Sequence, residues 1–295
     1  RRERLSTFPK AQSFREGKLS GLPLRQPASI YERESLMAWY LYLAVIAAGF
    51  AAGFINTLAG SGSLITLPLL IYLGLPANIA NGTNRVAILL QNVVGVSSFH
   101  RQKVLDWRGG LVLSLPAIVG SVIGAQIAVN LDETMMERSI GALMVVMLVV
   151  ILIRPQRWLE GQPEARRSGW KQWLIFFGIG LYGGFIQAGV GIFLLAGLVL
   201  SAGYDLVRAN AVKVLIVLYF TVSALAVFVI NGQVEWGVGI IMAIGSMLGA
   251  WVGARVAVER GAVFVRWLLV AVVLVSAADL LGVFELLRNR VFFSP

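Results

Sequence analysis

Long apolar runs without charge dominate this chain, and short polar points interrupt them. No charged residue stands between Leu41 and Asn84, although one helical crossing of a bilayer needs only about 20 residues. Inside that run lies a polar, glycine-rich stretch, residues 56–63. Irregular backbone is tolerated at membrane depth only where protein or a water-filled cavity covers it. The stretch therefore predicts a broken helix that lines a cavity.

The same pattern predicts an all-α polytopic membrane protein. Short broken or re-entrant segments are expected near 60–75 and 189–203, and longer helices elsewhere. The expected apolar segments are 39–58, 62–74, 81–99, 109–129, 134–153, 172–187, 190–203, 209–230, 237–257 and 262–283. They give a polar basic N-terminal tail (1–36), a first transmembrane repeat (37–155), a basic linker (156–171), a second repeat (172–284) and a C-terminal tail (285–295).

The two halves repeat one another at an offset of 129 residues, with four to five hydrophobic segments in each. The offset aligns these pairs: Gly62 with Gly191, Asn81 with Asn210, Trp107 with Trp236, Gly120 with Gly249, and Gly124 with Gly253. Paired, interrupted repeats are the usual build of secondary transporters, with the site between the halves. The repeated Gly-xxx-Gly spacings predict close helix packing, within the chain or between the subunits of a homodimer.

Topology follows from the positions of the basic residues. If each half crosses four times and the short segment dips into the membrane, both halves have the same orientation. The tail, the loop 100–108 and the linker 154–171 then all lie inside, as the positive-inside rule favours. Five spans in each half would invert the repeats. We therefore expect eight crossings, two short dipping segments and a cytoplasmic N-terminus in the plasma membrane.

Composition limits the classes of function that we expect. The chain is 58% hydrophobic and 14% charged, against roughly 25% charged residues in soluble domains. Its net charge of +10 comes from loops and tails, so nucleic acid is not an expected partner. There is no cysteine, and neither a metal-ligand cluster nor a catalytic motif stands out. We expect no metal, no cofactor and no enzymatic activity, with the lipid bilayer as surroundings.

Two isolated cations stand out at membrane depth, Arg85 and Lys213. Intramembrane charges are costly and mark functional sites. We expect each to follow a helix start, at Asn81 and Asn210, so that the N-cap and the positive helix dipole point at one anion site. The alternative is that both lie near the interface and extend to water. No acidic residue accompanies them in these segments, which argues against a cation carrier.

Polar and glycine residues at the two breaks complete the predicted substrate site. Glycines there let a ligand approach the backbone, and the alternative is a glycine-rich packing seam. The predicted substrate-binding residues are Asn56, Thr57, Gly60, Ser61, Gly62, Asn81, Thr83, Asn84, Arg85, Gln187, Gly189, Gly191, Asn210 and Lys213.

These motifs resemble the sulfite exporter TauE/SafE family. The resemblance rests on residues 53–63, 67–68, 74–76 and 80–84 in the first half, and on 183–185, 189–191, 209–213 and 249–255 in the second. It covers about Met37 to Leu281 and implies a plasma-membrane secondary transporter, often an exporter, of small sulfur-containing anions such as sulfite or organosulfonates. Serines interposed at Ser61 and Ser63 depart from the family's glycine-rich run and leave the substrate open.

The leading hypothesis is therefore an anion transporter that works by alternating access. The alternatives are a transporter of a non-sulfur anion and a membrane scaffold that transports nothing. We interpret residues 1–36 as an extension that is dispensable or foreign to the native protein, with Met37 as the start. Otherwise they form a disordered basic tail.

Overall fold

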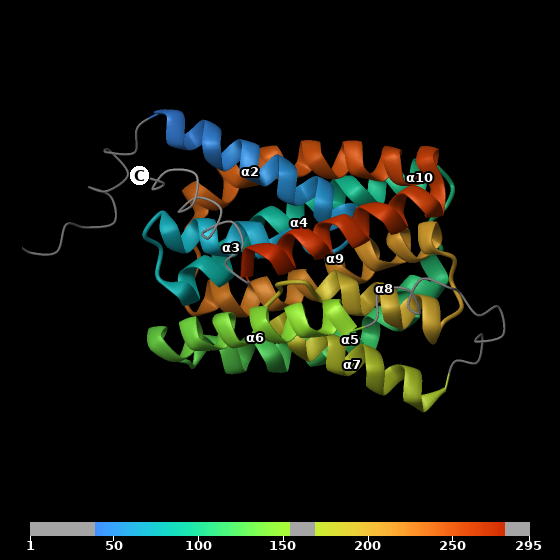
Figure 1. The fold of residues 1–295 in the computed structure, drawn as a ribbon. Coiled ribbons are helices and arrows are strands. Elements are labelled where there is room, and N and C mark those ends of the chain that lie inside the picture. The colour runs from blue at the N-terminus through green and yellow to red at the C-terminus, as the bar shows by residue number, and fades with distance from the viewer. Residues whose placement is uncertain (1–38, 154–168, 281–295) are drawn as a thin grey trace, which may run out of the picture. The chain divides into compact units, whose positions relative to one another are not determined.

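Every element that the structure describes is a helix (Figure 1). A computed structural model describes residues 39–153 and 169–280. The predicted tails, 1–36 and 285–295, and most of the linker lie outside these residues. The helices are α2 Trp39–Leu58, α3 Ser63–Tyr72, α4 Ala77–Arg101, α5 Trp107–Val129, α6 Glu133–Ile153, α7 Trp170–Phe185, α8 Val190–Leu200, α9 Leu206–Ile230 and α10 Trp236–Leu280.

The predicted breaks are confirmed. The chain leaves helical geometry after Leu58 and after Phe185, and a short helix follows each break. Gly60 and Gly189 have φ angles of 78° and 69°, a region that glycine enters without steric cost. We call α2 with α3 hairpin 1, and α7 with α8 hairpin 2.

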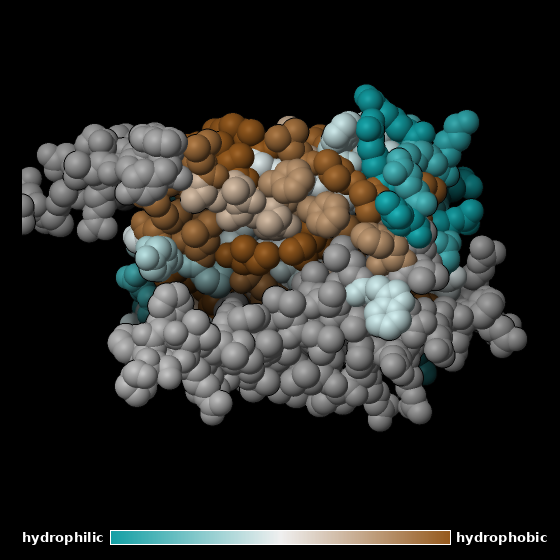
Figure 2. Space-filling model, turned by 45° about the horizontal axis from the view of Figure 1, so that its top comes forward, coloured by the Kyte–Doolittle hydropathy of each residue, from teal (hydrophilic) through white to brown (hydrophobic). Residues whose placement is uncertain are grey.

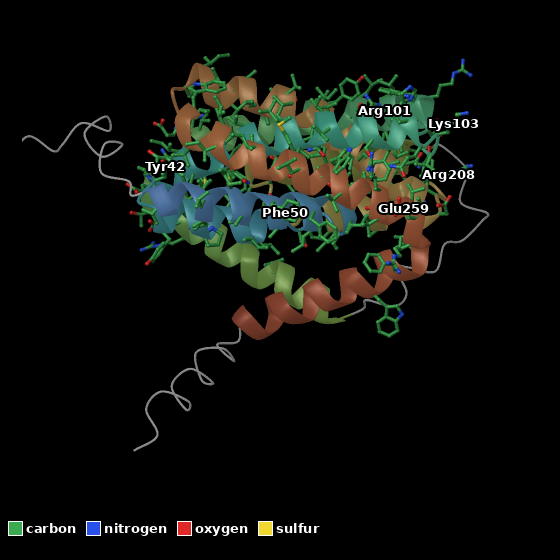
Figure 3. All side chains as sticks on the ribbon, turned by 90° about the horizontal axis from the view of Figure 1, so that it is seen from above. Tyr42, Phe50, Arg101, Lys103, Arg208 and Glu259 are labelled. Carbon is green, nitrogen blue, oxygen red and sulfur yellow. The ribbon has the colours of Figure 1, made fainter. Side chains whose placement is uncertain are left out.

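Charged residues gather at one end of the helices, which we call the Arg101 end. Figure 3 shows Arg101, Lys103, Arg208 and Glu259 there, and Tyr42 at the opposite end, the Tyr42 end. Figure 2 shows that one face between these ends is largely hydrophobic, with hydrophilic residues clustered at the Arg101 end. Four stretches, Leu41–Leu58, Trp107–Val129, Leu206–Ile230 and Trp236–Arg260, are long and apolar enough to cross a membrane.

Contacts between loops fix the direction of each helix. Tyr204 Oη donates to Asp106 Oδ2 at 2.7 Å, which places the α4–α5 and α8–α9 connections together at the Arg101 end. Gln233 Nε2 donates to the Val129 carbonyl at 3.0 Å, which places the end of α5 beside the α9–α10 connection at the Tyr42 end. Helix α4 therefore runs towards the Arg101 end, and its repeat mate α9 runs away from it.

The expected parallel orientation of the two halves is therefore wrong, because the repeats are inverted. Each short helix turns back, so that hairpin 1 returns to the Tyr42 end and hairpin 2 to the Arg101 end. Each half then adds three helical segments, which are α4, α5 and α6 in the first half and α9 with the two arms of α10 in the second (Figure 3). This odd number reverses the second half. Helix α2 consequently begins at the Tyr42 end and α7 at the Arg101 end (Figure 1), whereas the expected topology has both beginning on the same side.

Helix α10 combines the last two predicted spans. Its 45 residues would extend to about 68 Å if straight, more than twice the thickness of a bilayer core. Figure 3 shows the ribbon turning back beside Glu259. The two predicted spans thus form two antiparallel arms within one continuous helical assignment.

Glycines set the closest helix contacts, as the Gly-xxx-Gly spacings predicted. A Cβ atom on Gly124 of α5 would lie 2.0 Å from the Leu181 carbonyl oxygen of α7, and one on Gly249 of α10 would lie 2.1 Å from the Phe50 carbonyl oxygen of α2.

Other glycines make equally close contacts. A Cβ atom on Gly53 of α2 would lie 2.2 Å from the Ser246 carbonyl oxygen of α10. In the second half, a Cβ on Gly184 of α7 would lie 2.1 Å from the Ser121 carbonyl oxygen of α5. These glycines pack helices within the chain, and they position both hairpins against long helices.

Candidate functional site

The tips of the two hairpins meet in the interior of the molecule. The Gly191 N–H donates to the Gly60 carbonyl at 3.1 Å. A Cβ on Gly60 would lie 2.3 Å from the Gly191 Cα. Only glycine fits this contact, so the two breaks that the sequence pairs by repetition are also paired in space.

Lys213 binds the broken end of α2 from the opposite repeat. Its Nζ donates to the Asn56 carbonyl at 3.0 Å, the Thr57 carbonyl at 2.9 Å and Asn210 Oδ1 at 2.8 Å. The side chain is 1% exposed. The C-terminal end of a helix carries partial negative charge, so the ammonium group stabilises a helix end that has no water to solvate it.

Arg85 does the same for α7. Its Nη2 donates to the Gly184 carbonyl at 2.7 Å and its Nη1 to the Gly183 carbonyl at 3.1 Å. Longer bonds reach Asn81 Oδ1 at 3.3 Å and Gln187 Oε1 at 3.5 Å. The guanidinium is fully buried. Each repeat thus contributes one cation that holds the broken helix of the other.

The alternative that both cations extend to the interface is wrong, and so is the expectation that Asn81 and Asn210 cap their helices. Neither side chain extends to the interface, because both are buried inside the protein. Asn81 and Asn210 are not N-caps: α4 begins at Ala77, and α9 begins after Asp205, whose carboxylate caps it. Asp205 and the Pro76 turn start the helices about one turn earlier than the polar asparagines suggested. A direct anion contact of the two cations stays a prediction.

A small cavity with several polar residues in its lining lies beside hairpin 1. Its volume is about 10 Å³, room for about one water molecule. It is lined by Ala52, Asn56, Gly62, Ser63, Thr66, Asn84, Ala87, Ile88, Gln91 and Ser246. Helix α3 begins at Ser63, so the positive end of a short helix faces the cavity.

Asn84 is the least satisfied group in this lining. Its Oδ1 accepts a hydrogen bond from Thr66 Oγ1 at 2.7 Å, which leaves the amide hydrogens for another partner. Asn84 Nδ2 is buried and has no hydrogen-bond partner. A buried donor without a partner costs about 1–3 kcal/mol, so this amide is a candidate ligand for a negatively charged guest.

The second repeat has no equivalent polar lining. The offset of 129 residues matches Ser63 with Ile192, Thr66 with Leu195 and Gln91 with Phe220, all apolar in the second half. Asn84 itself matches Lys213, whose amine is held by α2. The polar lining is therefore present beside hairpin 1, and the matching positions beside hairpin 2 lack it.

The predicted residues fall into three groups. Asn56, Gly62 and Asn84 line the cavity. Most of the others surround the hairpin tips, where Gln187 Nε2 donates to Thr221 Oγ1 at 2.7 Å. Thr83 is not brought to either place, because its Oγ1 accepts from the Glu235 N–H at the Tyr42 end.

The sequence reasoning missed Thr66 and Ser246 as lining residues. Thr66 lies among apolar residues of a short helix, three positions after Ser63, and that spacing is the signal that it shares a helix face with Ser63. Ser246 comes from the distant α10, and no local pattern in the sequence brings it to α2.

A larger cleft opens at the Arg101 end. Its volume is about 540 Å³, and its lining includes Asp106, Arg108, Tyr204 and Arg208. Partial burial raises the pKa of the Asp106 carboxyl. Hydrogen bonds from the Gly109 N–H, Tyr204 and the Arg108 N–H, together with the Arg208 charge, outweigh this effect and hold the pKa below its usual value.

Known proteins resemble this chain over most of its length. The family model described as "Sulfite exporter TauE/SafE" matches residues 45–280. The chain is 30% identical over 247 residues to the "Probable membrane transporter protein ORF9" of Sinorhizobium sp, which covers 83% of this chain and 94% of that protein. No solved structure gives a match.

Two further relatives carry similar names. The "Probable membrane transporter protein YfcA" of Escherichia coli K12 is 30% identical over 232 residues, 78% of this chain and 86% of that protein. The "Probable membrane transporter protein YdhB" of Bacillus subtilis 168 is 22% identical over 219 residues, 73% of this chain and 88% of that protein.

Proposed function

Since the chain belongs to the sulfite exporter TauE/SafE family of membrane transporters, we propose that it carries small sulfur-containing oxyanions across the plasma membrane. Sulfite and organosulfonates are the proposed substrates. Each presents three oxygen atoms around one sulfur, which suits a site made of several hydrogen-bond donors.

The observation that carries this proposal is the polar cavity at the N-terminal end of α3. Asn84 lines this cavity and its amide Nδ2 has no hydrogen-bond partner, and Ser63 and Gln91 line the same space. No carboxylate lines the cavity, whereas a site for cations would require one. In transporters, the N-terminal ends of short helices bind the negatively charged groups of substrates.

The cavity lies between the repeats, since Ser246 of the second half completes a lining from the first. At about 10 Å³ it is too small for sulfite, so the substrate enters only when hairpin 1 moves away from α4 and α10. Movement of one repeat against the other around a fixed site is alternating access. We propose this mechanism, and export as the physiological direction, driven by a higher concentration of the anion inside than outside.

Flux measurements in proteoliposomes test the proposal. The purified protein should exchange labelled sulfite or methanesulfonate, and exchange should be slower with acetate and absent with tetraethylammonium. A variant with Asn84→Leu should lose most of the exchange. Equal flux of all these solutes, or none, would overturn the proposal, and the absence of flux would favour the scaffold alternative.

A further inference from the structure

We infer that Lys213 carries a proton that accompanies each transported anion, so that transport is coupled to protons without a sodium ion. The inference rests on the proposed anion transport and adds the coupling ion. It starts from the geometry of the cage of oxygen atoms around Lys213 Nζ.

Lys213 Nζ occupies the kind of site that binds coupling cations in other transporters. There, the C-terminal ends of broken helices and unwound carbonyls coordinate Na⁺ or H⁺. Here the Asn56 and Thr57 carbonyls at the end of α2, with Asn210 Oδ1, surround Nζ at 2.8 to 3.0 Å. The ammonium of the protein itself therefore takes the place of a free cation.

This cage fits the protonated form alone. An ammonium group has three N–H donors, and three oxygen atoms accept them. When a proton leaves Nζ for water, its bonding electrons remain on nitrogen as a lone pair. The amine then has two donors for three acceptors, and the lone pair faces an oxygen. Loss of the proton therefore weakens the grip of Lys213 on α2.

Among the side chains that the structure describes, no carboxylate contacts Lys213 Nζ. Helices α4, α5, α7 and α8 pack against α9, and the described α2 reaches Lys213 through its carbonyls. None of these helices has an Asp or Glu residue. Helix α10 carries Glu259, which is exposed at the Arg101 end (Figure 3), and Asp279 in its last turn. The other titratable groups that these helices carry are the following: Tyr40, Tyr42, Arg85, His100, Arg101, Arg108, Lys171, Tyr182, Arg255, Arg260 and Arg266.

Asn56 connects the proton to the substrate. Its carbonyl accepts from Lys213 Nζ, and the same residue lines the polar cavity. Coulomb attraction from an anion in that cavity stabilises the protonated, positively charged form of Lys213. Binding of the anion and protonation of Lys213 therefore support each other, and both are released together when hairpin 1 moves.

Arg85 cannot release and take up a proton during transport as Lys213 does. It holds hairpin 2 as Lys213 holds hairpin 1, but a guanidinium keeps its proton inside proteins. Lysine, in contrast, readily loses its proton when buried. Hairpin 1 is thus the responsive element, and hairpin 2 stays fixed through the cycle.

The test uses proteoliposomes with methanesulfonate, whose single negative charge does not change with pH. An inward proton gradient without an anion gradient should concentrate methanesulfonate inside several-fold, and a protonophore should abolish this. The variant Lys213→Arg should exchange methanesulfonate at equal pH more slowly than wild type and should fail to concentrate it. Lys171→Met, on an exposed lysine, should behave as wild type.

The outcomes separate the two proposals. Absence of exchange in wild type overturns the transport function itself. Exchange without accumulation under a proton gradient, or accumulation by Lys213→Arg, overturns the role of Lys213 alone.

A second variant keeps the inference falsifiable if Lys213→Arg fails to fold. Asn210→Leu removes one acceptor of the ammonium, while the buried Asn210 Nδ2 already lacks a partner. Its pH profile of methanesulfonate exchange should shift towards acid by about one unit or more, since a hydrogen bond to a charged group favours that form. An unchanged profile would contradict the inference.

Discussion

Asn84 accepts a hydrogen bond from Thr66 through its Oδ1 and has an amide Nδ2 without a partner. This amide is the group that we expect to bind the anion. Replacement of Asn84 by leucine keeps its approximate volume and removes the free amide from the cavity. Loss of a hydrogen bond to a charged ligand should weaken methanesulfonate binding about 10- to 100-fold, measured by calorimetry on purified protein. The matched control is Asn92→Leu on the same helix, since Asn92 Nδ2 donates to the Ile88 carbonyl of its own helix. Equal losses in both variants would contradict a specific role for Asn84.

Asp106 gives a prediction about pH at the Arg101 end. Its lowered pKa means that the charged carboxylate stabilises the folded state above the ordinary value of 3.8. This stabilisation is lost as the pH falls through the lower folded value. Asp106→Asn should lower stability at pH 7 by about 0.5 kcal/mol, because asparagine still caps α5. Thermal unfolding curves of both proteins should converge below that pH, and a constant difference would refute this account.

At the residue scale, the sequence identified Arg85 and Lys213 correctly as exceptional, because isolated charges are rare at membrane depth. It could not identify their partners. These are backbone carbonyls of the opposite repeat, and every residue has a carbonyl, so no residue type marks them. Asn84 was predicted for the site, whereas Ser246 was not, because only the packing of α10 on α2 brings it there.

At the scale of elements, backbone contact through glycine determines where the hairpins lie. A valine at Gly53 would place its Cβ 2.2 Å from the Ser246 carbonyl oxygen and force α2 away from α10. We expect destabilisation of about 3 kcal/mol and a lower unfolding midpoint in detergent. Gly178→Val is the control, since nothing lies within 4 Å of a Cβ there. If both variants unfold alike, close packing is not the reason.

Helix breaks were predictable because Gly, Ser and Asn clusters are conspicuous in apolar runs. The residues at which helices begin were harder to predict. The predicted start at Asn210 followed a general preference for asparagine at N-caps, but Asp205 stands a turn earlier and caps α9 with two backbone bonds. The sequence predicted two separate segments, 237–257 and 262–283, whereas α10 stays helical between them.

At the scale of the whole molecule, inversion of the repeats has a direct test. The chain has no cysteine, so a single introduced thiol can be labelled selectively. Lys103→Cys follows α4 at the Arg101 end, and Asn231→Cys follows its repeat mate α9 at the Tyr42 end; both positions are exposed. A membrane-impermeant maleimide should label one variant from outside intact cells and the other only after permeabilisation. Labelling of both from the same side would contradict the inverted arrangement.

Topology was the weakest prediction because the charge rule compares loops and counts their basic residues. It cannot tell whether a short apolar segment crosses or returns, and that choice decides whether each half contains an odd or even number of crossings. The return of α3 depends on the Thr66–Asn84 bond and on the short turn before Ala77.

The contact between the hairpin tips also supplies an internal reporter of the transport cycle. The Gly191 amide hydrogen is held by the Gly60 carbonyl, and it can exchange with deuterium only when the tips separate. Its peptide should exchange slowly in the resting protein and faster while methanesulfonate and a proton gradient drive turnover, as mass spectrometry can record. Fast exchange at rest would show that the two halves separate without any substrate. If exchange is slow at rest and faster during turnover, breakage of this one backbone bond between two glycines marks each opening of the transporter.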